Sequence, residues 1–372
     1  MKIAIHAADL DHKRIDGTRV YIFNVLKNLG LINKKDTFII YHQSEFNPNL
    51  APPVFKNYAI KKLPFPKFWT QVRFAWQVFR DAPDVLWMPM HNVPILRRRK
   101  MKVVVTIHDL AFKIFPSYFP PRDLAKLNRL SDHAIKNADQ IIAVSNSTKN
   151  DILKFYPEIS QDKITVVHHG FDSEIFSRKI ITKEAERLMA TYDLEPRTYL
   201  LYVGAIQPRK NLNVLIDAFE KIKTLRPELK LVIAGAPAWQ YQSTLDKIAS
   251  SQFANDIIVT GVLNFSQIAA LYQKAEVFVF PSLYEGFGIP VLEAMAAGVP
   301  VVLANNSSLP EVAGDSALYF ETESSIDLTE KIESILKDEK LRKELIKKGS
   351  ERVKEFSWEK CARQTLDVIL KK

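Results

Sequence analysis

The sequence feature that most constrains the fold is an alternation of short apolar runs with segments of helical period, which begins at the N-terminus, stops once and begins again. Short runs rich in Val and Ile are typical of strands buried on both faces of a sheet. Strand–helix–strand alternation predicts an α/β fold with parallel sheets covered by helices. The first series of predicted strands comprises residues 2–7, 37–42, 84–89, 102–109, 140–145 and 164–170. Residues 20–30 have a helical period, and we expect that helix to end at Gly30.

The alternation stops between residues 173 and 198, where the chain is polar and helix-prone. A second series of predicted strands follows at residues 199–205, 230–235, 256–261, 277–282, 300–304 and 317–320. A chain of 372 residues is long for one core and suits two domains of ordinary size. We therefore predict two doubly wound domains in tandem, with bounds 1–178 and 196–355.

The positive charge of the chain is concentrated in its first half. Residues 1–180 contain 28 Lys and Arg against 16 Asp and Glu, and they contain all eight histidines. A basic half suits an anionic surface or substrate. Membrane phospholipid, a phosphate-linked lipid carrier and nucleic acid all stay open on charge alone.

The expected compartment follows from features that the sequence lacks. No apolar run approaches the roughly 18 residues that span a bilayer, and the N-terminal MKIAIHAADL has no long apolar segment of the signal-peptide kind. The single cysteine, Cys361, excludes an intramolecular disulfide and a cysteine-based metal cluster. We expect a cytoplasmic protein, with peripheral contact to the inner membrane face left open.

The richest candidate site is the turn after the predicted strand 277–282. Gly286 and Gly288 allow the backbone to approach a ligand closely or to take positive φ. A strand, a glycine loop and a helix N-terminus predict an anion site, because free N–H groups and the helix dipole favour phosphate. Glu285 and Glu293 flank this site; carboxylates repel phosphate but accept hydrogen bonds from sugar hydroxyls. A nucleotide sugar carries both kinds of group, whereas a plain surface loop would leave the two glycines unexplained.

A basic turn follows the predicted strand 199–205, which we expect to end at Gly204. Arg209 and Lys210 come just before a helix predicted to begin near Asn211. Two cations at a strand end can bind a diphosphate, Lys as a point charge and Arg as a fork. Alone, such a pair is usually a solvated loop, but beside the glycine loop it predicts a diphosphate site.

These two turns resemble the donor-site motifs of the retaining glycosyltransferases of family GT4, which share the GT-B fold of two facing Rossmann-like domains. The resemblance rests on EGFGIPVLEAMAAGVPVV (285–302) and GAIQPRKNLNVLIDAF (204–219), and it covers most of residues 100–320. Further similar segments are TIHDLAF (106–112), AVSNSTKNDI (143–152), HHGFD (168–172) and NSSLPEVAGDSALYF (306–320). The resemblance implies a hexosyltransferase with a nucleotide-sugar donor held mainly by the second domain. Residues 356–372 are similar to the family's last helix, which crosses back onto the first domain.

The resemblance also implies roles for single residues. Glu293 would bind the ribose hydroxyls, and Glu285 would hold the transferred sugar. Arg209 and Lys210 would neutralise the diphosphate leaving group, and His108 would contact the donor sugar. The implied donor-binding set is Gly17, Gly204, Arg209, Lys210, Glu285, Gly286, Phe287, Gly288, Ile289 and Glu293, and the implied catalytic set is His108, Arg209, Lys210 and Glu285.

The chain departs from the family pattern at three positions. Ala205 stands where many members have arginine, so stabilisation of the leaving group rests more heavily on the two cations of the basic turn. The N-terminal loop DGTRVY contains one glycine, Gly17, where the family's loop is often glycine-rich, and Arg19 fills the space nearby. His169 stands in place of the usual asparagine.

His108 and the acidic residues of the first half raise the question of metal or base chemistry. Asp109 beside His108 could orient the imidazole for base catalysis or metal ligation, but a hydrogen bond to the donor sugar asks less of it and is the interpretation we favour. Asp9 and Asp11 form a D-x-D at the end of the first predicted strand, which is a weak signal. Since no His, Asp and Glu group has a recognisable metal-ligand spacing, we predict no essential metal ion, and we expect no cofactor besides the donor substrate.

Two further segments of the basic half fit a bilayer interface. Residues 64–80 mix aromatic and aliphatic side chains with three cations, and residues 97–102 form a charge run. For 64–80 we favour a core helix whose charges extend into solvent. For 97–102 a solvated loop and binding to an anionic surface stay equal alternatives.

The donor and the competing functions complete the sequence-based expectations. The PRKN and IHDLAF forms resemble bacterial mannosyltransferases of surface-polysaccharide assembly, so we favour GDP-mannose, with UDP-sugars open, and a saccharide or lipid-linked saccharide acceptor. A nucleotide-sugar epimerase of the same two-domain type is the alternative enzyme. A non-catalytic anion-binding protein is the other alternative; because RNA-binding motifs are absent from the sequence, we expect no nucleic-acid partner.

Overall fold

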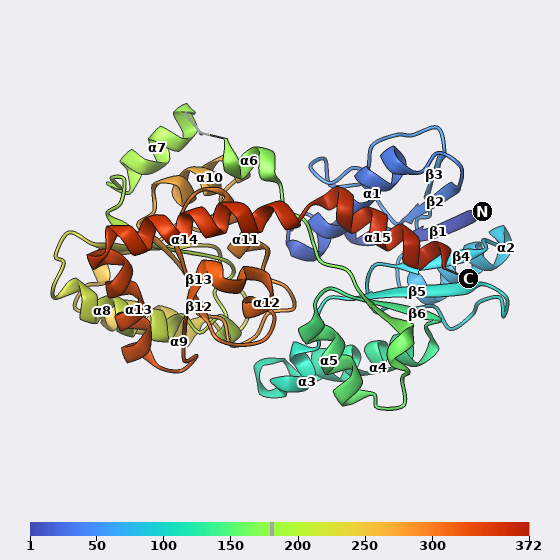
Figure 1. The fold of residues 1–372 in the computed structure, drawn as a ribbon. Helices are drawn as coiled ribbons and strands as arrows, with labels where there is room; N and C mark the ends of the chain where they lie inside the picture. The colour runs from blue at the N-terminus through green and yellow to red at the C-terminus, as the bar shows by residue number, and fades with distance from the viewer. Residues whose placement is uncertain (179–181, 372) are drawn as a thin grey trace. The chain divides into compact units, whose positions relative to one another are not determined.

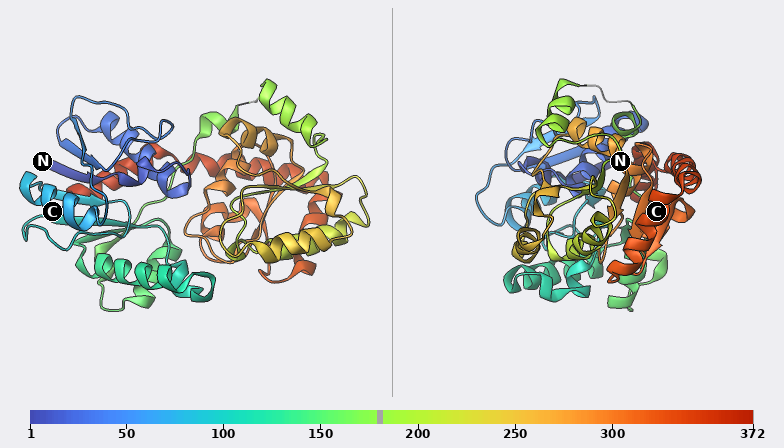
Figure 2. Two further views of the ribbon diagram at one scale, coloured as in Figure 1. Left: turned by 180° about the vertical axis from the view of Figure 1, so that it is seen from behind. Right: turned by 90° about the vertical axis from the view of Figure 1, so that its left-hand side faces the viewer.

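The computed structural model describes residues 1–178 and 182–371, and the chain forms two compact units (Figure 1). The first comprises Met1–Gly170 and the C-terminal segment from Ser357, and the second comprises Phe171–Phe356. Each unit is a parallel sheet with helices on both faces, as the two further views show (Figure 2). The predicted α/β class with two Rossmann-like domains is thereby confirmed.

The first unit is built on a sheet with strand order β3-β2-β1-β4-β5-β6-β7. Because β1 pairs with β2 on one side and with β4 on the other, the strand order reverses at β1. The strands are β1 (Lys2–His6), β2 (Thr37–His42), β3 (Tyr58–Lys62), β4 (Val85–Met88), β5 (Lys102–Ile107), β6 (Gln140–Ala143) and β7 (Ile164–Val166). The helices are α1 (Gly17–Ile32), α2 (Ala75–Asp81), α3 (Ala111–Ile114), α4 (Pro121–Asn137), α5 (Asn146–Phe155) and α15 (Trp358–Leu370).

The second unit repeats this plan with strand order β10-β9-β8-β11-β12-β13, and here the order reverses at β8. The strands are β8 (Tyr199–Val203), β9 (Lys230–Ala234), β10 (Ile257–Val259), β11 (Val277–Phe280), β12 (Val301–Ala304) and β13 (Ala317–Phe320). The helices are α6 (Ser173–Ser177), α7 (Lys183–Thr191), α8 (Leu212–Lys223), α9 (Gln242–Ser250), α10 (Phe265–Lys274), α11 (Ile289–Ala296), α12 (Leu309–Ala313), α13 (Ser325–Lys337) and α14 (Glu339–Arg352).

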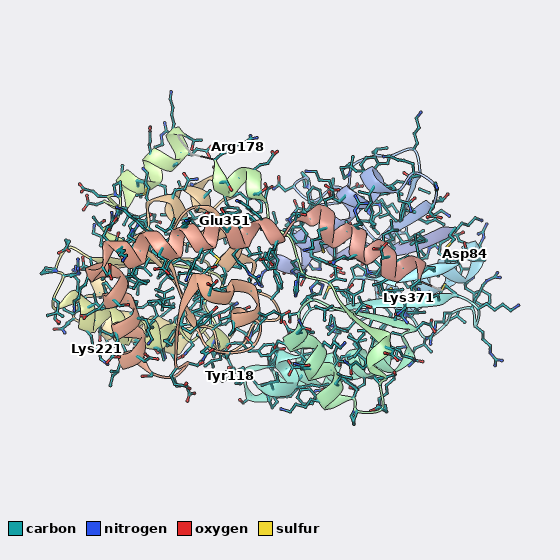
Figure 3. All side chains as sticks on the ribbon, in the orientation of Figure 1. Asp84, Tyr118, Arg178, Lys221, Glu351 and Lys371 are labelled. Carbon is teal, nitrogen blue, oxygen red and sulfur yellow. The ribbon has the colours of Figure 1, made fainter. Side chains whose placement is uncertain are left out.

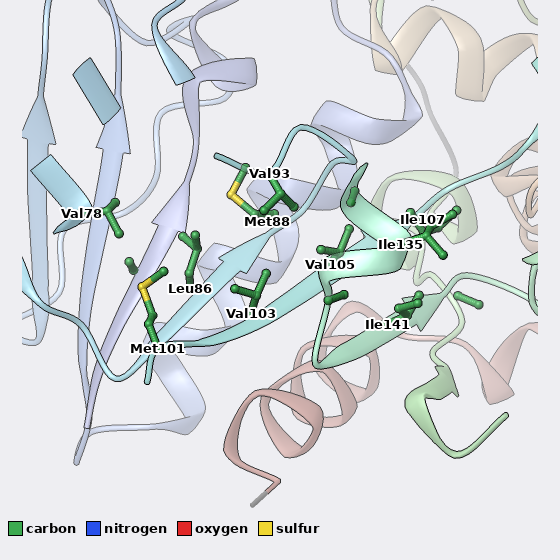
Figure 4. Packing of buried hydrophobic residues seen from close by; sticks show 14 of the residues in the cluster. Val78, Leu86, Met88, Val93, Met101, Val103, Val105, Ile107, Ile135 and Ile141 are labelled. Atoms are coloured by element: carbon green, nitrogen blue, oxygen red, sulfur yellow. The ribbon is translucent and has the colours of Figure 1, made fainter. Parts of the chain in front are cut away.

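The central strands form where the sequence is apolar at every position, because both faces of each sheet are covered. Every residue of β4, β8, β11 and β12 is buried. Charged side chains lie on the outside of each unit, among them Asp84, Lys221 and Glu351 (Figure 3). Side chains from α2, α4 and the strands β4, β5 and β6 interlock in the core of the first unit (Figure 4). Across the described ranges, no helix has both the length and the apolar character needed to cross a membrane.

The edge strand β3 was not predicted. Its sequence YAIKK contains two lysines, and its residues are intermediate or exposed. Because β3 pairs with β2 alone, it needs no apolar cover on both faces. A search for fully apolar runs therefore passes over it.

The division between the units lies earlier in the chain than the predicted bounds of 178 and 196. The structure assigns residues from Phe171 onward to the second unit. The reason is packing: α6 contacts α10 and α11, and α7 contacts α10. Residues 179–181, within the polar stretch on which the prediction rested, lie outside the described residues.

The helix α15 packs on α1 in the first unit (Figure 1). It begins at Trp358 with a Ser357 cap, whose side chain accepts a hydrogen bond from the amide of Lys360.

The expectation that α1 ends at Gly30 is wrong, since α1 continues to Ile32. Gly30 serves packing instead, because a Cβ there would lie 2.0 Å from the ring of Phe55.

Candidate functional site

The two candidate turns of the second unit follow the two strands between which the strand order reverses. Residues 204–211 follow β8, and residues 281–288 follow β11. Ligands of open α/β sheets bind beyond the carboxyl ends of the strands at such a switch point. A backbone hydrogen bond of 2.9 Å, donated by Leu283 to the carbonyl of Arg209, joins the two turns.

Three charged side chains of these turns form one ionic cluster, Arg209–Lys210–Glu285. Lys210 Nζ lies 2.5 Å from Oε1 of Glu285, and Arg209 Nη1 lies 3.5 Å from Oε2. Lys210 and Glu285 are only 9% and 8% exposed. Burial opposes the charged form of Glu285, but the neighbouring Lys210 and Arg209 outweigh burial and lower its pKa. The cluster therefore holds a carboxylate and two cations in a largely water-excluded position.

The cations are positioned by the fold as well as by their charge. Arg209 donates a hydrogen bond to the carbonyl of Tyr284, and the Lys210 ammonium lies 5.2 Å from the ring centroid of Phe280 in β11. Both belong to a short 3-10 turn, Pro208–Lys210, which ends at Asn211 with φ 54°. The two cations are thus fixed at the end of β8, directly before α8.

The glycine loop is held in shape by two serines that the sequence analysis did not select. Ser308 Oγ donates to the carbonyl oxygens of Glu285 and Phe287 over 2.9 Å and 2.7 Å. Ser307 Oγ accepts a hydrogen bond of 3.0 Å from the amide of Glu285. The sequence carries a signal for these two serines, because the polar segment NNSS (305–308) directly follows the predicted strand 300–304.

The loop leads into α11 through Gly288, which has φ 107°, a left-handed value that favours glycine. Ile289 is the first residue of α11, and Pro290 occupies its first turn. Gly286 and Phe287 are buried. The arrangement agrees with the predicted strand–loop–helix order, in which α11 begins four residues after Glu285 of the cluster.

Glu293 lies one turn into α11 and is half-buried. Its Oε2 accepts a hydrogen bond of 3.2 Å from the hydroxyl of Tyr272, which also donates to the carbonyl of Pro290. Burial raises the pKa of Glu293 to about 7; the Tyr272 hydrogen bond opposes this and the charge of Asp172 adds to it. Ligand hydroxyls that donate to this carboxyl would favour its charged form.

Gly204 directly follows β8, which ends at Val203, one residue before the predicted end, and the Gly204 backbone lies against that of Gly235. A Cβ on the neighbouring Gly235 would lie 1.9 Å from the carbonyl oxygen of Gly204. Gly204 also donates its amide hydrogen to the carbonyl of Ala234 over 3.0 Å. Any side chain at Gly235 would therefore displace the turn that carries Arg209 and Lys210.

This arrangement is suited to a ligand that is anionic in one part and rich in hydroxyls in another. Two cations and the N-terminus of α11 favour a diphosphate. Glu285 and Glu293 offer acceptors for hydroxyl groups.

His108 belongs to the first unit, where it follows β5. Its Nε2 lies 3.0 Å from the carbonyl oxygen of Pro89, so Nε2 carries the proton and donates it there. Burial lowers the pKa of His108, although Pro89 and the charge of Asp109 oppose the shift. The Asp109 carboxylate does not orient the ring as we considered; it accepts a hydrogen bond of 3.0 Å from the amide of Ala111, the first residue of α3.

Gly17 also belongs to the first unit, as the exposed first residue of α1. Asp16 caps this helix by accepting from the amide of Arg19 over 3.2 Å. The Arg19 side chain turns back to pair with Asp16 and donates to the carbonyl of Asp9 over 3.0 Å. The second unit thus brings Arg209, Lys210 and Glu285 into contact. The roles of all predicted site residues, Gly17 and His108 included, stay predictions.

The D-x-D of the first half has a structural use. Asp11 accepts hydrogen bonds from the amides of Gln43 and Ser44 over 2.8 Å and 2.7 Å, and it lies 3.3 Å from His42 Nδ1. Within residues 1–178 and 182–371, no three side chains of His, Cys, Asp and Glu converge as metal ligands would.

Two family models match this chain. The model described as glycosyl transferases group 1 matches residues 186–352, and the model described as glycosyltransferase family 4 matches residues 17–175. Each model falls mainly on one of the two units.

Curated relatives and solved structures agree with these matches. O-antigen chain mannosyltransferase B of Escherichia coli is 30% identical over 297 residues, which is 79% of this chain and 76% of that protein. The serotype-specific mannosyltransferase WbdA of Escherichia coli is 30% identical over 292 residues, 75% of this chain but only 34% of that longer protein. The structure of HepE from Anabaena in complex with UDP and glucose aligns with a TM-score of 0.75 over all of both chains at 16% identity, which shows the shared GT-B fold.

Proposed function

The chain belongs to family 4 of the glycosyltransferases, and from that premise we propose that it transfers a hexose from a nucleotide sugar to a saccharide or lipid-linked saccharide, with retention of the anomeric configuration. The observation that carries the proposal is the Arg209–Lys210–Glu285 cluster at the switch point of the second sheet, beside the N-terminus of α11.

The proposed donor is held in two parts. Its diphosphate replaces part of the contact that Glu285 makes with Arg209 and Lys210, so the cations turn from an internal partner to the ligand. The freed Glu285 oxygen accepts a hydrogen bond from a hydroxyl of the transferred sugar, with support from the amides of Phe287 and Gly288. Glu293 accepts hydrogen bonds from the ribose hydroxyls.

The proposed transfer needs positioning and charge stabilisation more than a covalent intermediate. The bond between the anomeric carbon and the phosphate oxygen breaks, and negative charge collects on the leaving diphosphate. Arg209, Lys210 and the N-terminus of α11 stabilise that charge. The acceptor hydroxyl attacks the same face, and a leaving phosphate oxygen takes its proton. A neutral His108, with Nε2 committed to Pro89, would serve as a hydrogen-bond partner of the sugar.

We propose GDP-mannose as donor, because the two Escherichia coli relatives carry the name mannosyltransferase. The structural neighbour HepE holds UDP and glucose, which supports a nucleotide-sugar substrate and keeps UDP-sugars in the panel to be tested. We place the reaction in surface-polysaccharide assembly, on the strength of the O-antigen relative.

A donor-turnover assay tests this proposal. The purified chain is incubated with GDP-mannose and with other GDP- and UDP-sugars, with and without a lipid-linked saccharide, and release of nucleoside diphosphate is followed. We expect acceptor-dependent release from one donor, a product whose anomeric configuration by NMR matches the donor, and a loss on the order of 100-fold in kcat/KM for Lys210→Met.

The matched control is Lys223→Met. Lys223 is a second buried lysine of the same unit, paired with Asp256 at 3.0 Å and placed at the far end of α8. Its substitution should leave turnover unchanged at temperatures where the variant is folded. Absence of turnover with every donor, or equal losses in the two lysine variants, would contradict the proposed function.

A further inference from the structure

The helical segment 70–81 of the first unit has two apolar faces, and only one of them is used by the fold. It consists of a π-helical turn, Thr70–Phe74, followed by α2. One face buries Phe74 and Val78 in the core, as the core-helix interpretation of 64–80 expected. On the other face Val72, Trp76 and Phe79 are exposed, with Trp76 48% exposed, so the segment also presents the apolar surface that the bilayer-interface alternative requires.

The loop before β5 extends this unused face. Ile95, 72% exposed, donates its amide hydrogen to the side chain of Gln71 over 3.0 Å. Arg98 donates to the carbonyl of Phe79 over 2.7 Å and stacks 5.1 Å from its ring. The loop is therefore fastened along the helical segment. We call the resulting surface the outer patch; its apolar members are Phe68, Val72, Trp76, Phe79, Ile95 and Leu96.

The outer patch is surrounded by positive charge. Residues 64–101 contain seven Lys and Arg against two acidic residues, Asp81 and Asp84. Both acids are engaged by the fold: Asp81 pairs with Lys61 at 2.6 Å, and Asp84 accepts from the amide of Lys2. Arg73 and Arg80 lie 5.4 Å and 5.5 Å from the ring of Trp76. Arg73, Arg80 and Arg98 thus form a cationic rim beside the apolar side chains of the patch.

We propose that the outer patch binds the surface of a bilayer that contains anionic phospholipid. Aromatic side chains with a cationic rim suit the interface, where the rings enter the acyl boundary and the cations stay among the headgroups. A second copy of the chain is a poor occupant, since a two-fold contact would place the same cations against each other. Nucleic acid would leave Val72, Ile95 and Leu96 against a polar backbone.

This inference deepens the proposed function and rests on it, because a lipid-linked acceptor is presented at such a bilayer surface. The physical claim concerns the patch alone and does not depend on the donor site. Its test therefore uses no transfer reaction.

Co-sedimentation of the full chain with phosphatidylcholine vesicles, with and without phosphatidylglycerol, tests the proposal. We expect binding to the phosphatidylglycerol vesicles, weakened in 1 M salt because screening shortens to about 3 Å. Trp76→Ser with Phe79→Ser, and separately Arg73→Gln with Arg80→Gln, should each reduce binding about tenfold or more. The matched control is Leu31→Ser with Val54→Ser, two residues of the same unit that are 55% and 86% exposed.

The outcomes separate this inference from the proposed function. Failure of the wild-type chain to bind phosphatidylglycerol vesicles, or equal binding by the Trp76 and Phe79 variant, would overturn the inference. So would a dimer in lipid-free sedimentation that the same variant abolishes, since it would assign the patch to a second copy. Nucleotide binding is measured on the same preparations; its absence in a chain that binds vesicles would count against the proposed function and leave the membrane surface standing.

Discussion

The charge of Glu285 depends on two neighbours that belong to a different turn of the chain. Burial alone would favour a neutral carboxyl, yet Lys210 at 2.5 Å and Arg209 at 3.5 Å lower its pKa. Such an ion cluster is coupled, because removal of one member leaves another buried charge without compensation. The cluster therefore links the stability of the unit to the residues proposed to bind the donor.

The substitution Lys210→Met should lower the free energy of unfolding by about 2–4 kcal/mol at pH 7. The double variant with Glu285→Gln should recover part of this loss, since the unpaired carboxylate is then gone. The loss should also shrink as the pH falls below the ordinary Glu range, because the stabilisation from a lowered pKa disappears there. Denaturant titrations of the double-mutant cycle measure it; losses that simply add would contradict the coupling.

The raised pKa of Glu293 predicts a pH-dependent affinity for nucleotides. With a pKa of about 7, the carboxyl is mostly neutral at pH 6 and mostly charged at pH 8. Since ribose hydroxyls donate to the charged form, affinity for a nucleoside diphosphate should rise by up to about tenfold over this interval. Calorimetric titration at both pH values gives the ratio. Glu293→Gln is the control, because any pH dependence that remains in it comes from titration of the nucleotide itself. The same ratio of affinities in this variant as in wild type would exclude Glu293 as the group that binds the ribose.

The raised pKa of Glu293 also predicts that stability falls over the pH interval in which nucleotide affinity rises. Between the ordinary value of 4.5 and about 7, folded Glu293 retains a proton that the unfolded chain releases, so its contribution to the free energy of unfolding falls as the pH rises. Glu293→Gln should therefore stabilise the chain by about 1–3 kcal/mol at pH 8 relative to wild type and by less at pH 5. Thermal unfolding at the two pH values measures this difference. A variant that is no more stable than wild type at pH 8 would show that the carboxyl is not shifted.

At the scale of elements, the turn that carries Arg209 and Lys210 is positioned by the close approach of the ends of β8 and β9. Gly235 and Gly298 provide a matched pair of glycines in the second unit. A Cβ on Gly235 would lie 1.9 Å from the carbonyl oxygen of Gly204, whereas Gly298, with φ 79°, has nothing within 4 Å of that position. Gly298→Ala carries only the conformational penalty of about 1 kcal/mol.

We expect Gly235→Ala to be more damaging than Gly298→Ala and to act on function as well as on stability. Its clash involves backbone, so the turn after β8 must shift, and Arg209 and Lys210 shift with it. Nucleotide affinity should fall for Gly235→Ala and stay unchanged for Gly298→Ala when both are measured below their melting temperatures. Equal affinities would mean that the turn adapts without moving its cations.

The sequence predicts the central elements well and the supporting ones poorly, for physical reasons. Strands covered on both faces must be apolar throughout, so β11 and β12 stand out as runs, whereas the edge strand β3 does not. Arg209, Lys210 and Glu285 can be predicted because glycine and charge at a strand end are unusual. Tyr272 cannot be selected this way, because it lies inside α10 and its use depends on the carboxyl that the fold brings to it. Ser308 follows a predicted strand, but the sequence does not show which loop carbonyls it will bind.

At the scale of the whole molecule, the C-terminal helix ties the end of the chain to its beginning. Trp358, Leu366, Val368 and Ile369 of α15 are buried in the first unit, where α15 packs on α1. Burial of an apolar side chain of this size stabilises by about 1.5–3 kcal/mol. The first unit therefore depends on residues that follow the whole of the second unit in the sequence.

Truncation after Phe356 should consequently destabilise the first unit by on the order of 5 kcal/mol and spare the second. Hydrogen exchange should show lost protection in α1 and β1 and retained protection in β8 and β9. The control is Glu359→Ala with Arg363→Ala, an exposed ion pair on α15. Unchanged protection of α1 in the truncated chain would contradict the dependence.

The central claim is that the second unit binds a nucleotide sugar through the two turns at its switch point. A thermal-shift screen against GDP, UDP, ADP and their sugars tests it, with Glu293→Ala as the site variant and Glu351→Ala as the exposed control. A ligand at a hundredfold excess over its dissociation constant stabilises by about 2.7 kcal/mol. We predict a clear shift with one nucleotide, kept in Glu351→Ala and lost in Glu293→Ala. No shift with any nucleotide at millimolar concentration would contradict the account and favour a non-catalytic anion-binding protein.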